Sequence, residues 1–316
     1  MTDETKQDGS DRWTAWNADT VDVARALPDG SADFSVFSPP FASLYTYSNS
    51  PRDMGNVRND SEFFAHYRFL IREQFRVMRA GRNVSIHCML MPTSKERDGY
   101  IGLRDFRGAI IRAYQACQLE VPCDRPADAE RCEHAFIFHS EVAIWKDPVT
   151  AMQRTKALGL LHKTIRKDSA MSRQGINDYL VTMRKPGKND VPIAHVEGTA
   201  SELPVSLWQR YASPVWMDID PSDTLQHRSA REEEDERHIC PLQLGVIRRA
   251  VELWSNPGEV VWSPFMGIGS EGVVALEMGR RFVGAELKSS YYAQAIANLK
   301  IAERVKQQDL FAPGAA

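Results

Sequence analysis

Short apolar segments alternate with helix-like segments at both ends of the chain, and this alternation constrains the fold more than any other feature. Helix-like segments end at residue 27, span 61–78, 103–118 and 241–254, end at 278 and run through 305. The strand-like segments are 13–19, 34–37, 83–87, 135–145, 259–262 and 281–286. Strands that alternate with helices pack into a sheet with helices on both faces, so the predicted fold class is α/β.

The composition fits a globular chain. Its 316 residues correspond to about two domains, or to one large domain with an insertion. Hydrophobic residues make up 43% and charged residues 26%, and no uncharged apolar run approaches the roughly 18 residues that span a bilayer. Membrane-spanning and wholly disordered chains are therefore excluded. Residues 1–11 lack secretory features, and the five cysteines are an odd, sparse set, so we expect a cytoplasmic protein with reduced thiols.

The central part of the chain differs from both ends in charge. The whole chain has a net charge of −3, but residues 146–188 contain ten basic and three acidic residues. We predict an inserted region over 146–236, between parts at 1–145 and 237–316. Clustered cations suit a surface that follows nucleic-acid phosphates, although an ordinary solvated basic segment is the alternative. The candidate DNA-binding residues are Lys156, His162, Lys163, Arg166, Lys167 and Arg173.

A loop with glycines follows the strand at 259–262 and precedes a helix. Small residues in this loop, 263–270, let the backbone approach a ligand while amide groups of the helix N-terminus point outward. Glu286 ends the next strand, 19 residues after Gly267, where a carboxylate accepts hydrogen bonds from both hydroxyls of a ribose. We therefore predict a nucleotide-type site. Its candidate residues are Pro264, Phe265, Gly267, Gly269, Ser270 and Glu286.

Two other interpretations of the glycine loop stay open. Gly267, Gly269 and Gly272 fit the Gly-x-Gly-x-x-Gly pattern of NAD-dependent oxidoreductases. Only about 30 residues follow Glu286, which is too few for a second mononucleotide-binding half, so NAD is disfavoured. The loop could also be a structural turn without a ligand.

The strand at 34–37 stops at Ser38-Pro39-Pro40-Phe41. Two prolines fix a rigid, non-helical loop, and α/β sheets place their chemistry at the carboxyl ends of strands. Alone, the tetrapeptide fits an ordinary strand-ending turn equally well. Together with the glycine loop and Glu286, it indicates a catalytic loop.

These motifs resemble those of the DNA amino-methyltransferases, whose catalytic loop reads Asp, Asn or Ser, then two prolines and an aromatic residue. Because the 38–41 loop precedes the glycine loop, the chain resembles the permuted beta group of that family. The resemblance implies a circularly permuted Rossmann-like sheet, S-adenosylmethionine as cofactor and double-stranded DNA as substrate. It also implies that 146–236 recognises the target sequence.

The resemblance extends to further residues. It assigns cofactor contacts to Asp19, in the segment Asn17-Ala18-Asp19, and to His238 and Pro241 ahead of the glycine loop. Ser263 departs from the family's usual Asp, which concerns cofactor affinity and not the fold.

The implied reaction methylates an exocyclic amino nitrogen whose lone pair is delocalised into the base. The Ser38 hydroxyl and the Pro39 carbonyl can accept from its N–H groups and so localise that pair, while Phe41 stacks on a base that has left the duplex. Holding the nitrogen in line with the methyl group is a positioning effect. Within the family, Ser-Pro-Pro loops go more often with N4 of cytosine and Asp-Pro-Pro loops with N6 of adenine. We favour cytosine N4, with adenine N6 as the alternative.

The cysteines and two histidines are expected to be structural. Pro122-Cys123 matches a dipeptide of cytosine C5 methylation, but its position does not fit that family's motif order. Cys117, Cys123, Cys132 and His134 lack the tight spacing of a zinc site, so no metal is predicted. His87 and His139 lie in apolar strands and are expected in core or supporting positions.

A catalytically silent DNA-binding module remains a further alternative, because of Ser263. Formation of a homodimer, the recognition sequence and the presence of an accompanying restriction enzyme, as in restriction-modification, stay open.

Overall fold

Nine strands form one sheet in the computed structural model, which describes residues 5–41, 53–57, 59–119, 132–155, 157–199, 201–226 and 241–311. In the order in which they pair, the strands are β1 (Lys6–Gly9), β2 (Trp13–Asn17), β11 (Arg281–Glu286), β10 (Val260–Ser263), β3 (Phe34–Phe37), β4 (Asn83–Met89), β8 (Asp178–Arg184), β7 (Ile137–Ile144) and β9 (Val215–Trp216).

The centre of the sheet is parallel. Strands β2, β11, β10, β3 and β4 run in one direction, while β1 and β8 pair antiparallel with β2 and β4. All four residues of β3 are buried, as expected for a parallel strand that is covered on both faces. The predicted α/β class is confirmed.

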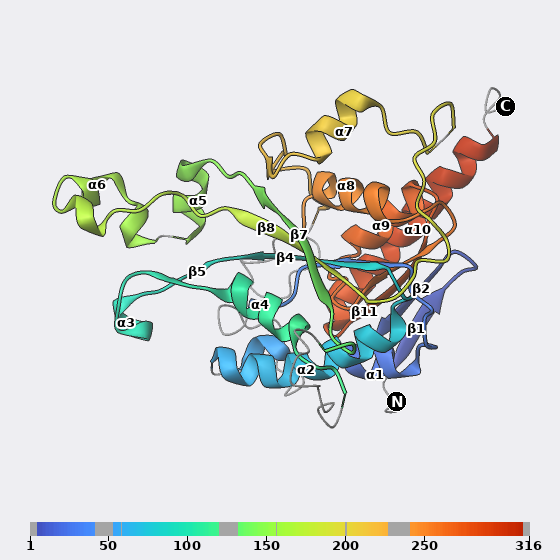
Figure 1. Cartoon of the computed structure of the whole chain (residues 1–316), viewed down its shortest axis with the longest axis horizontal. Helices are drawn as coiled ribbons and strands as arrows, with labels where there is room; N and C mark the ends of the chain where they lie inside the picture. The colour runs from blue at the N-terminus through green and yellow to red at the C-terminus, as the bar shows by residue number, and fades with distance from the viewer. Residues whose placement is uncertain are drawn as a thin grey trace.

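Helices cover both faces of the sheet (Figure 1). One face carries α1 (Thr20–Ala26), α2 (Asp60–Val77) and α4 (Phe106–Gln115), and the other carries α8 (Leu244–Trp254), α9 (Ser270–Glu277) and α10 (Ser289–Phe311). The buried apolar residues sort into two main clusters that follow these two helix groups. None of the helices in the described ranges combines the length and the apolar character that a bilayer crossing requires.

The helix predicted over 103–118 begins later and ends earlier. Its N-cap is Asp105, whose carboxylate accepts from the Gly108 N–H at 2.8 Å, so α4 starts only after this residue. Leu103–Arg104 instead forms β6, which pairs with β5 (Met91–Pro92). The short helix α3 (Lys95–Asp98) lies between β5 and β6.

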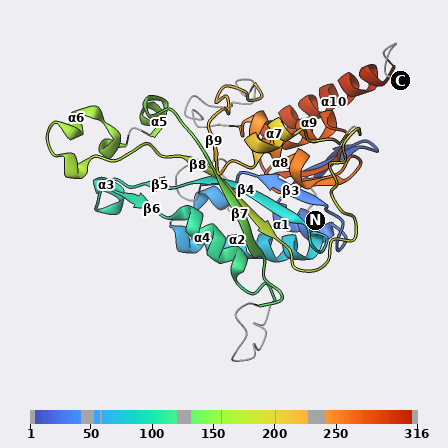
Figure 2. The ribbon, with the colours of Figure 1, turned by 45° about the horizontal axis from the view of Figure 1, so that its top comes forward.

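The region predicted as an insertion, 146–236, contributes two strands to the sheet. β8 pairs with both β4 and β7, and β9 pairs with β7. Between β7 and β8 the chain leaves the sheet as an arm, residues 145–177, that projects from the body of the molecule (Figures 1 and 2). Its elements are α5 (Pro148–Thr155), η3 (Leu158–Leu160), α6 (His162–Ile165) and η4 (Ser169–Met171). Helix α7 (Val205–Tyr211) follows β8.

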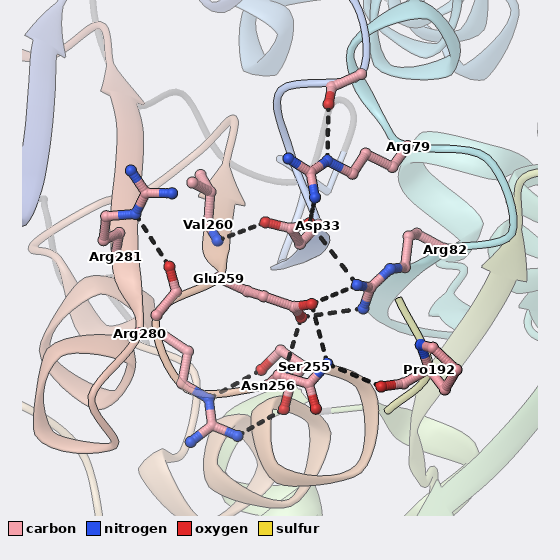
Figure 3. A network of polar contacts seen from close by, with 12 residues as sticks. Asp33, Arg79, Arg82, Pro192, Ser255, Asn256, Glu259, Val260, Arg280 and Arg281 are labelled. Carbon is pink, nitrogen blue, oxygen red and sulfur yellow. Dashed lines mark hydrogen bonds and ion pairs between the residues drawn. The ribbon is translucent and has the colours of Figure 1, made fainter. Parts of the chain in front are cut away.

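A buried network of polar contacts joins the segments ahead of β4 and β10 (Figure 3). Arg82 is 1% exposed, and its guanidinium contacts both carboxylate oxygens of Glu259, with 3.0 Å between Nη1 and Oε2. Asn256 donates to the same carboxylate from its backbone N–H at 2.7 Å and from its side-chain amide at 3.0 Å. The charge of Arg82 is therefore compensated inside the protein.

Asp33 extends this network to the segment ahead of β3. Its carboxylate accepts from the Val260 N–H at 2.8 Å and pairs with Arg79 at 2.9 Å. Asp33, Arg82 and Glu259 each precede a parallel strand, so the network fixes the edge of the sheet that lies opposite the strands' carboxyl ends.

We expect Glu259→Ala to lower the free energy of unfolding by about 3–5 kcal/mol, because the buried Arg82 would lose its main counter-charge. Urea denaturation measures this value. In the matched control, Asp190→Ala breaks the exposed Lys188–Asp190 pair and should change it by less than about 0.5 kcal/mol. Equal effects of the two substitutions would contradict the structural role of the network.

Candidate active site

Neighbouring parallel strands carry the two predicted loops. In the register of β3 and β10, Phe34 lies opposite Val261 and Ser35 opposite Trp262. The Ser35 hydroxyl also donates to the Trp262 carbonyl at 2.8 Å. Because the carboxyl ends of parallel strands meet at one edge, the 38–41 loop and the 263–270 loop lie next to each other there.

A cavity of about 260 Å³ opens at this edge. Both loops line it: from the first come Ser38, Pro39, Pro40 and Phe41, and from the second Pro264, Phe265, Gly267 and Ser270. The predicted cofactor residues Asp19, Pro241 and Glu286 also line it. Phe41 and Gly267, which come from opposite ends of the sequence, thus face one shared space.

Some predicted residues do not line this cavity or lie outside the described residues. Gly269 does not line the cavity. His238, Lys156 and Cys123 fall outside the described ranges. Within the described ranges, no three His, Cys, Asp or Glu side chains are grouped as a metal ion would need.

The two loop glycines have different surroundings. Gly267 has a φ of +51°, and no atom lies within 4 Å of the place where a Cβ would stand, so its backbone faces open space. Gly269 has a φ of +90° and precedes α9, and a Cβ there would lie 3.3 Å from the Cα of Ala295 on α10. Gly267 therefore keeps the cavity open, whereas Gly269 lets α10 pack closely.

Glu286 is held by backbone donors at the end of β11. Its Oε2 accepts from the Gly267 N–H at 3.0 Å, and its Oε1 accepts from the Lys288 N–H at 2.8 Å. The Asn17 side-chain amide donates to the carbonyls of Glu286 at 2.9 Å and of Leu287 at 3.0 Å, which orders the turn after β11. Each carboxylate oxygen keeps a second lone pair, so Glu286 can accept further hydrogen bonds in the cavity.

Glu271 is a second carboxyl at the cavity, and it is buried, but the motifs did not predict it. It lies in the first turn of α9, and its Oε2 has no hydrogen-bond partner among the described residues. Burial, reinforced by the charge of Glu286, raises the pKa of Glu271 to about 8. Burial likewise raises the pKa of Glu286 to about 7. A bound cation would stabilise the ionised form of both carboxyls.

Acidic side chains are more numerous than basic ones in the cavity lining. The basic residues of the lining are Lys146 and Lys288. The acidic residues are Asp19, Asp53, Asp178, Glu271 and Glu286. This lining suits a ligand with cationic groups and repels the two negative charges of a dinucleotide pyrophosphate. The N–H of Gly267, which a pyrophosphate would need, already donates to Glu286. The site therefore argues against NAD.

The 38–41 loop is supported from two sides. Phe41 packs against Phe106 of α4, with ring centroids 6.2 Å apart in an edge-on arrangement. The Ser38 Oγ lies 3.3 Å from Nδ1 of His87, on the adjacent strand β4. His87 Nε2 in turn lies 2.9 Å from Asp178 Oδ2, and the Lys146 ammonium pairs with the same oxygen.

The sequence identified His87 only as a core or supporting residue. The position of His87 near the end of β4 could have indicated that it lies close to the 38–41 loop, because β4 pairs parallel with β3 and neighbouring parallel strands bring their carboxyl ends together. The same expectation is wrong for His139, which is exposed on β7 and contacts Ser140 Oγ at 2.8 Å.

Most candidate DNA-binding side chains are exposed on the arm. His162, Lys163, Arg166 and Lys167 are exposed on and after α6. Arg173 is partly buried, and its backbone N–H donates to the Gly159 carbonyl at 2.8 Å. Burial lowers the pKa of the Arg173 guanidinium. The four exposed side chains, three of them cationic, are therefore accessible to a polyanion.

Comparison with known proteins identifies the family. A model of the DNA methylase family matches residues 32–297, which is most of the chain. The chain belongs to the DNA methylase family. The predicted N4/N6 amino-methyltransferase family is confirmed.

Sequence similarity to a curated relative covers a small part of each chain. The DNA adenine methyltransferase YhdJ of Escherichia coli K12 is 32% identical over 78 residues, which are 25% of this chain and 26% of YhdJ. The chain thus spans about a quarter of the length of that relative.

Similarity to solved structures covers nearly the whole chain. The Thermus thermophilus protein TTHA0409, complexed with S-adenosyl-L-methionine, has a TM-score of 0.61 and 20% identity, over 90% of this chain and 94% of that chain. The PvuII DNA methyltransferase, titled cytosine-N4-specific, has a TM-score of 0.61 and 13% identity, over 92% of this chain and 86% of that chain. These similarities confirm the predicted methyltransferase fold.

We expect Glu271→Gln to remove a loss of stability that develops as the pH rises from about 4.5 to about 8. The unfolded chain releases this proton near the ordinary pKa of 4.5 and the folded chain only near 8, so rising pH across this window favours unfolding. Between pH 5.5 and 8.5 the melting temperature of the wild type should fall by a few degrees more than that of the variant.

Thermal denaturation without ligand across this pH range measures the difference. Glu197→Gln, which changes an exposed carboxyl, is the control and should follow the wild-type curve. Parallel curves for wild type and Glu271→Gln would show that the carboxyl of Glu271 ionises normally in the folded protein.

Proposed function

We propose that the protein is an S-adenosylmethionine-dependent DNA amino-methyltransferase that acts on a base flipped out of double-stranded DNA. The observation that carries the proposal is the single cavity lined by both the 38–41 loop and the glycine loop. A methyl donor and an amino group react efficiently only when one site holds both in near-attack geometry. Family membership supports DNA as the substrate.

The glycine-loop half of the cavity fits the cofactor. S-adenosylmethionine carries a sulfonium and an ammonium group, and the carboxyls of the buried Glu271 and the partly buried Glu286 match this positive charge. Glu286 would hold the ribose hydroxyls with its remaining lone pairs. When bound, the cofactor supplies an electrophilic methyl group. Further contacts would come from Asp19, Pro241, Pro264, Phe265, Gly267 and Ser270.

The 38–41 half of the cavity fits the base. The Ser38 oxygen and the Pro39 carbonyl would accept from the two N–H groups of the amino nitrogen, which localises its lone pair for attack. Phe41, supported by Phe106, would stack on the base and offset part of the flipping cost, which is on the order of a few kcal/mol.

We favour N4 of cytosine as the target. The resemblance associates Ser at the first loop position with cytosine N4, and the PvuII enzyme, titled cytosine-N4-specific, has a similar fold. The adenine methyltransferase name of YhdJ supports adenine N6 as the second candidate.

The arm between β7 and β8 is the proposed DNA-recognition element. β7 runs parallel to β4, so its end and the start of β8 lie at the same edge as the cavity. Lys146 and Asp178, near the two ends of the arm, both line the cavity. The exposed cations of the arm would then contact phosphates near a flipped base. This assignment keeps 1–145 as the catalytic part and 237–316 as the cofactor part.

We expect Ser38→Ala to lower methyl transfer to DNA by about 100-fold, because the amino group loses one acceptor. The measurement is incorporation of tritium from labelled S-adenosylmethionine into mixed-sequence DNA. Ser213→Ala, at a partly buried serine before β9 that does not line the cavity, is the control and should keep full activity. Equal labelling by wild type and Ser38→Ala would refute the catalytic role of the loop.

Nucleoside analysis of the labelled DNA identifies the base. We expect N4-methylcytosine, because of the Ser-Pro-Pro loop. N6-methyladenine would show that the preference for cytosine is wrong while leaving the methyltransferase assignment intact.

We expect Arg166→Ala and Lys167→Ala each to weaken DNA binding and to reduce the slope of log affinity against log salt by about one, because each removes a phosphate contact. Fluorescence anisotropy at several salt concentrations measures both quantities. Lys188→Ala removes one exposed cation at the opposite edge of the sheet and should change neither. Identical slopes for all three variants would exclude the arm as the DNA-binding surface.

A further inference from the structure

Four polar side chains from four segments form a continuous chain behind the 38–41 loop. Ser38 Oγ lies 3.3 Å from His87 Nδ1, His87 Nε2 lies 2.9 Å from Asp178 Oδ2, and Lys146 pairs with that same oxygen. His87 and Asp178 are 7% and 2% exposed. All four residues line the cavity, with His87 on β4 and Asp178 on the adjacent strand β8.

Asp178 sets the direction of the hydrogen bonds. Burial alone would raise the pKa of Asp178, but its interactions with His87 and Lys146 outweigh burial and lower the pKa to about 2. Asp178 is therefore a carboxylate that can only accept, so Nε2 of His87 must carry a hydrogen. In the neutral imidazole, Nδ1 is then an acceptor that faces the Ser38 hydroxyl.

The hydroxyl of Ser38 is therefore directed inward. Its two neighbours on His87, Nδ1 at 3.3 Å and the backbone carbonyl at 3.5 Å, are both acceptors. With its hydrogen used there, the serine oxygen keeps its lone pairs for a donor in the cavity. An exocyclic amino group is such a donor.

We propose that His87 and Asp178 are positioning residues that act through Ser38, and that His87 takes up the proton which the methylated amino group releases. This inference rests on the proposed function. The N–H bond of the methylated, cationic amino group breaks, and its electron pair stays on nitrogen. The proton goes to Ser38 Oγ while the serine proton passes to His87 Nδ1. The imidazolium that results lies against the carboxylate of Asp178.

Lys146 completes the arrangement. Its ammonium pairs with Asp178 and keeps the carboxylate ionised before His87 gains a proton. The arm, residues 145–177, contains Lys146 near its start and ends directly before Asp178, so both of its ends contact this group of four side chains. A contact between DNA and the arm could therefore act on the Ser38 hydroxyl through these two residues.

The first test is the tautomer of His87 in the ligand-free protein. Nitrogen-15 NMR of histidine-labelled protein, assigned with His87→Gln and recorded at a pH where the ring carries a single proton, should place that proton on Nε2. In Asp178→Asn the side-chain amide can donate to Nε2, so the ring should move to the Nδ1-protonated form. A wild-type ring protonated at Nδ1 would overturn the inference, even if Asp178→Asn failed to fold.

The second test is kinetic. His87→Gln and Asp178→Asn should lower kcat by about 100-fold. KM for DNA and calorimetric binding of S-adenosylmethionine should stay within about threefold of wild type, because neither residue is proposed to hold cofactor or DNA. His139→Gln, at the exposed histidine on β7, is the control and should keep the wild-type kcat. A kcat within threefold of wild type for His87→Gln would overturn proton uptake by His87.

The two tests separate this inference from the proposed function. If the wild type labels no DNA, the proposed function fails, while the NMR spectra still decide the hydrogen-bond direction. If the wild type labels DNA and His87 has the other tautomer, only the inference fails.

Discussion

The parallel pairing of β3 with β10 is the contact on which the rest of the structure depends. It joins a strand near the start of the chain to one near its end, and so places the 38–41 loop beside the glycine loop. The buried contacts of Arg82 and Asp33 with Glu259 and Val260 fix the same strands at their opposite ends. A parallel pair held at one end leaves its other end available for chemistry.

Charge then divides the cavity into two halves. The glycine-loop half holds Glu271 and Glu286, whose raised pKa values disfavour ionisation unless a cation is present. The other half holds Ser38, whose hydroxyl is oriented by a histidine and an ionised aspartate. One half is therefore suited to a positively charged methyl donor, and the other to a neutral amino group that must lose a proton.

Much of the fold and part of the site could be predicted from the sequence. The strands at 34–37 and 281–286 have the predicted bounds, because turn residues and prolines end each apolar run. Glu271 and the contacts of His87 could not be predicted in this way. They depend on burial beside Glu286 and on the antiparallel pairing of β8 with β4, which no local pattern in the basic segment reveals.

The most direct test of the shared cavity is a crystal structure with sinefungin, a stable analogue that carries an amine in place of the methylated sulfonium. The ribose of sinefungin should contact Glu286. The amine that stands in the place of the transferred methyl group should point toward Ser38 across the cavity. Sinefungin bound elsewhere, or with its amine turned away from the 38–41 loop, would contradict the claim that the two loops form one active site.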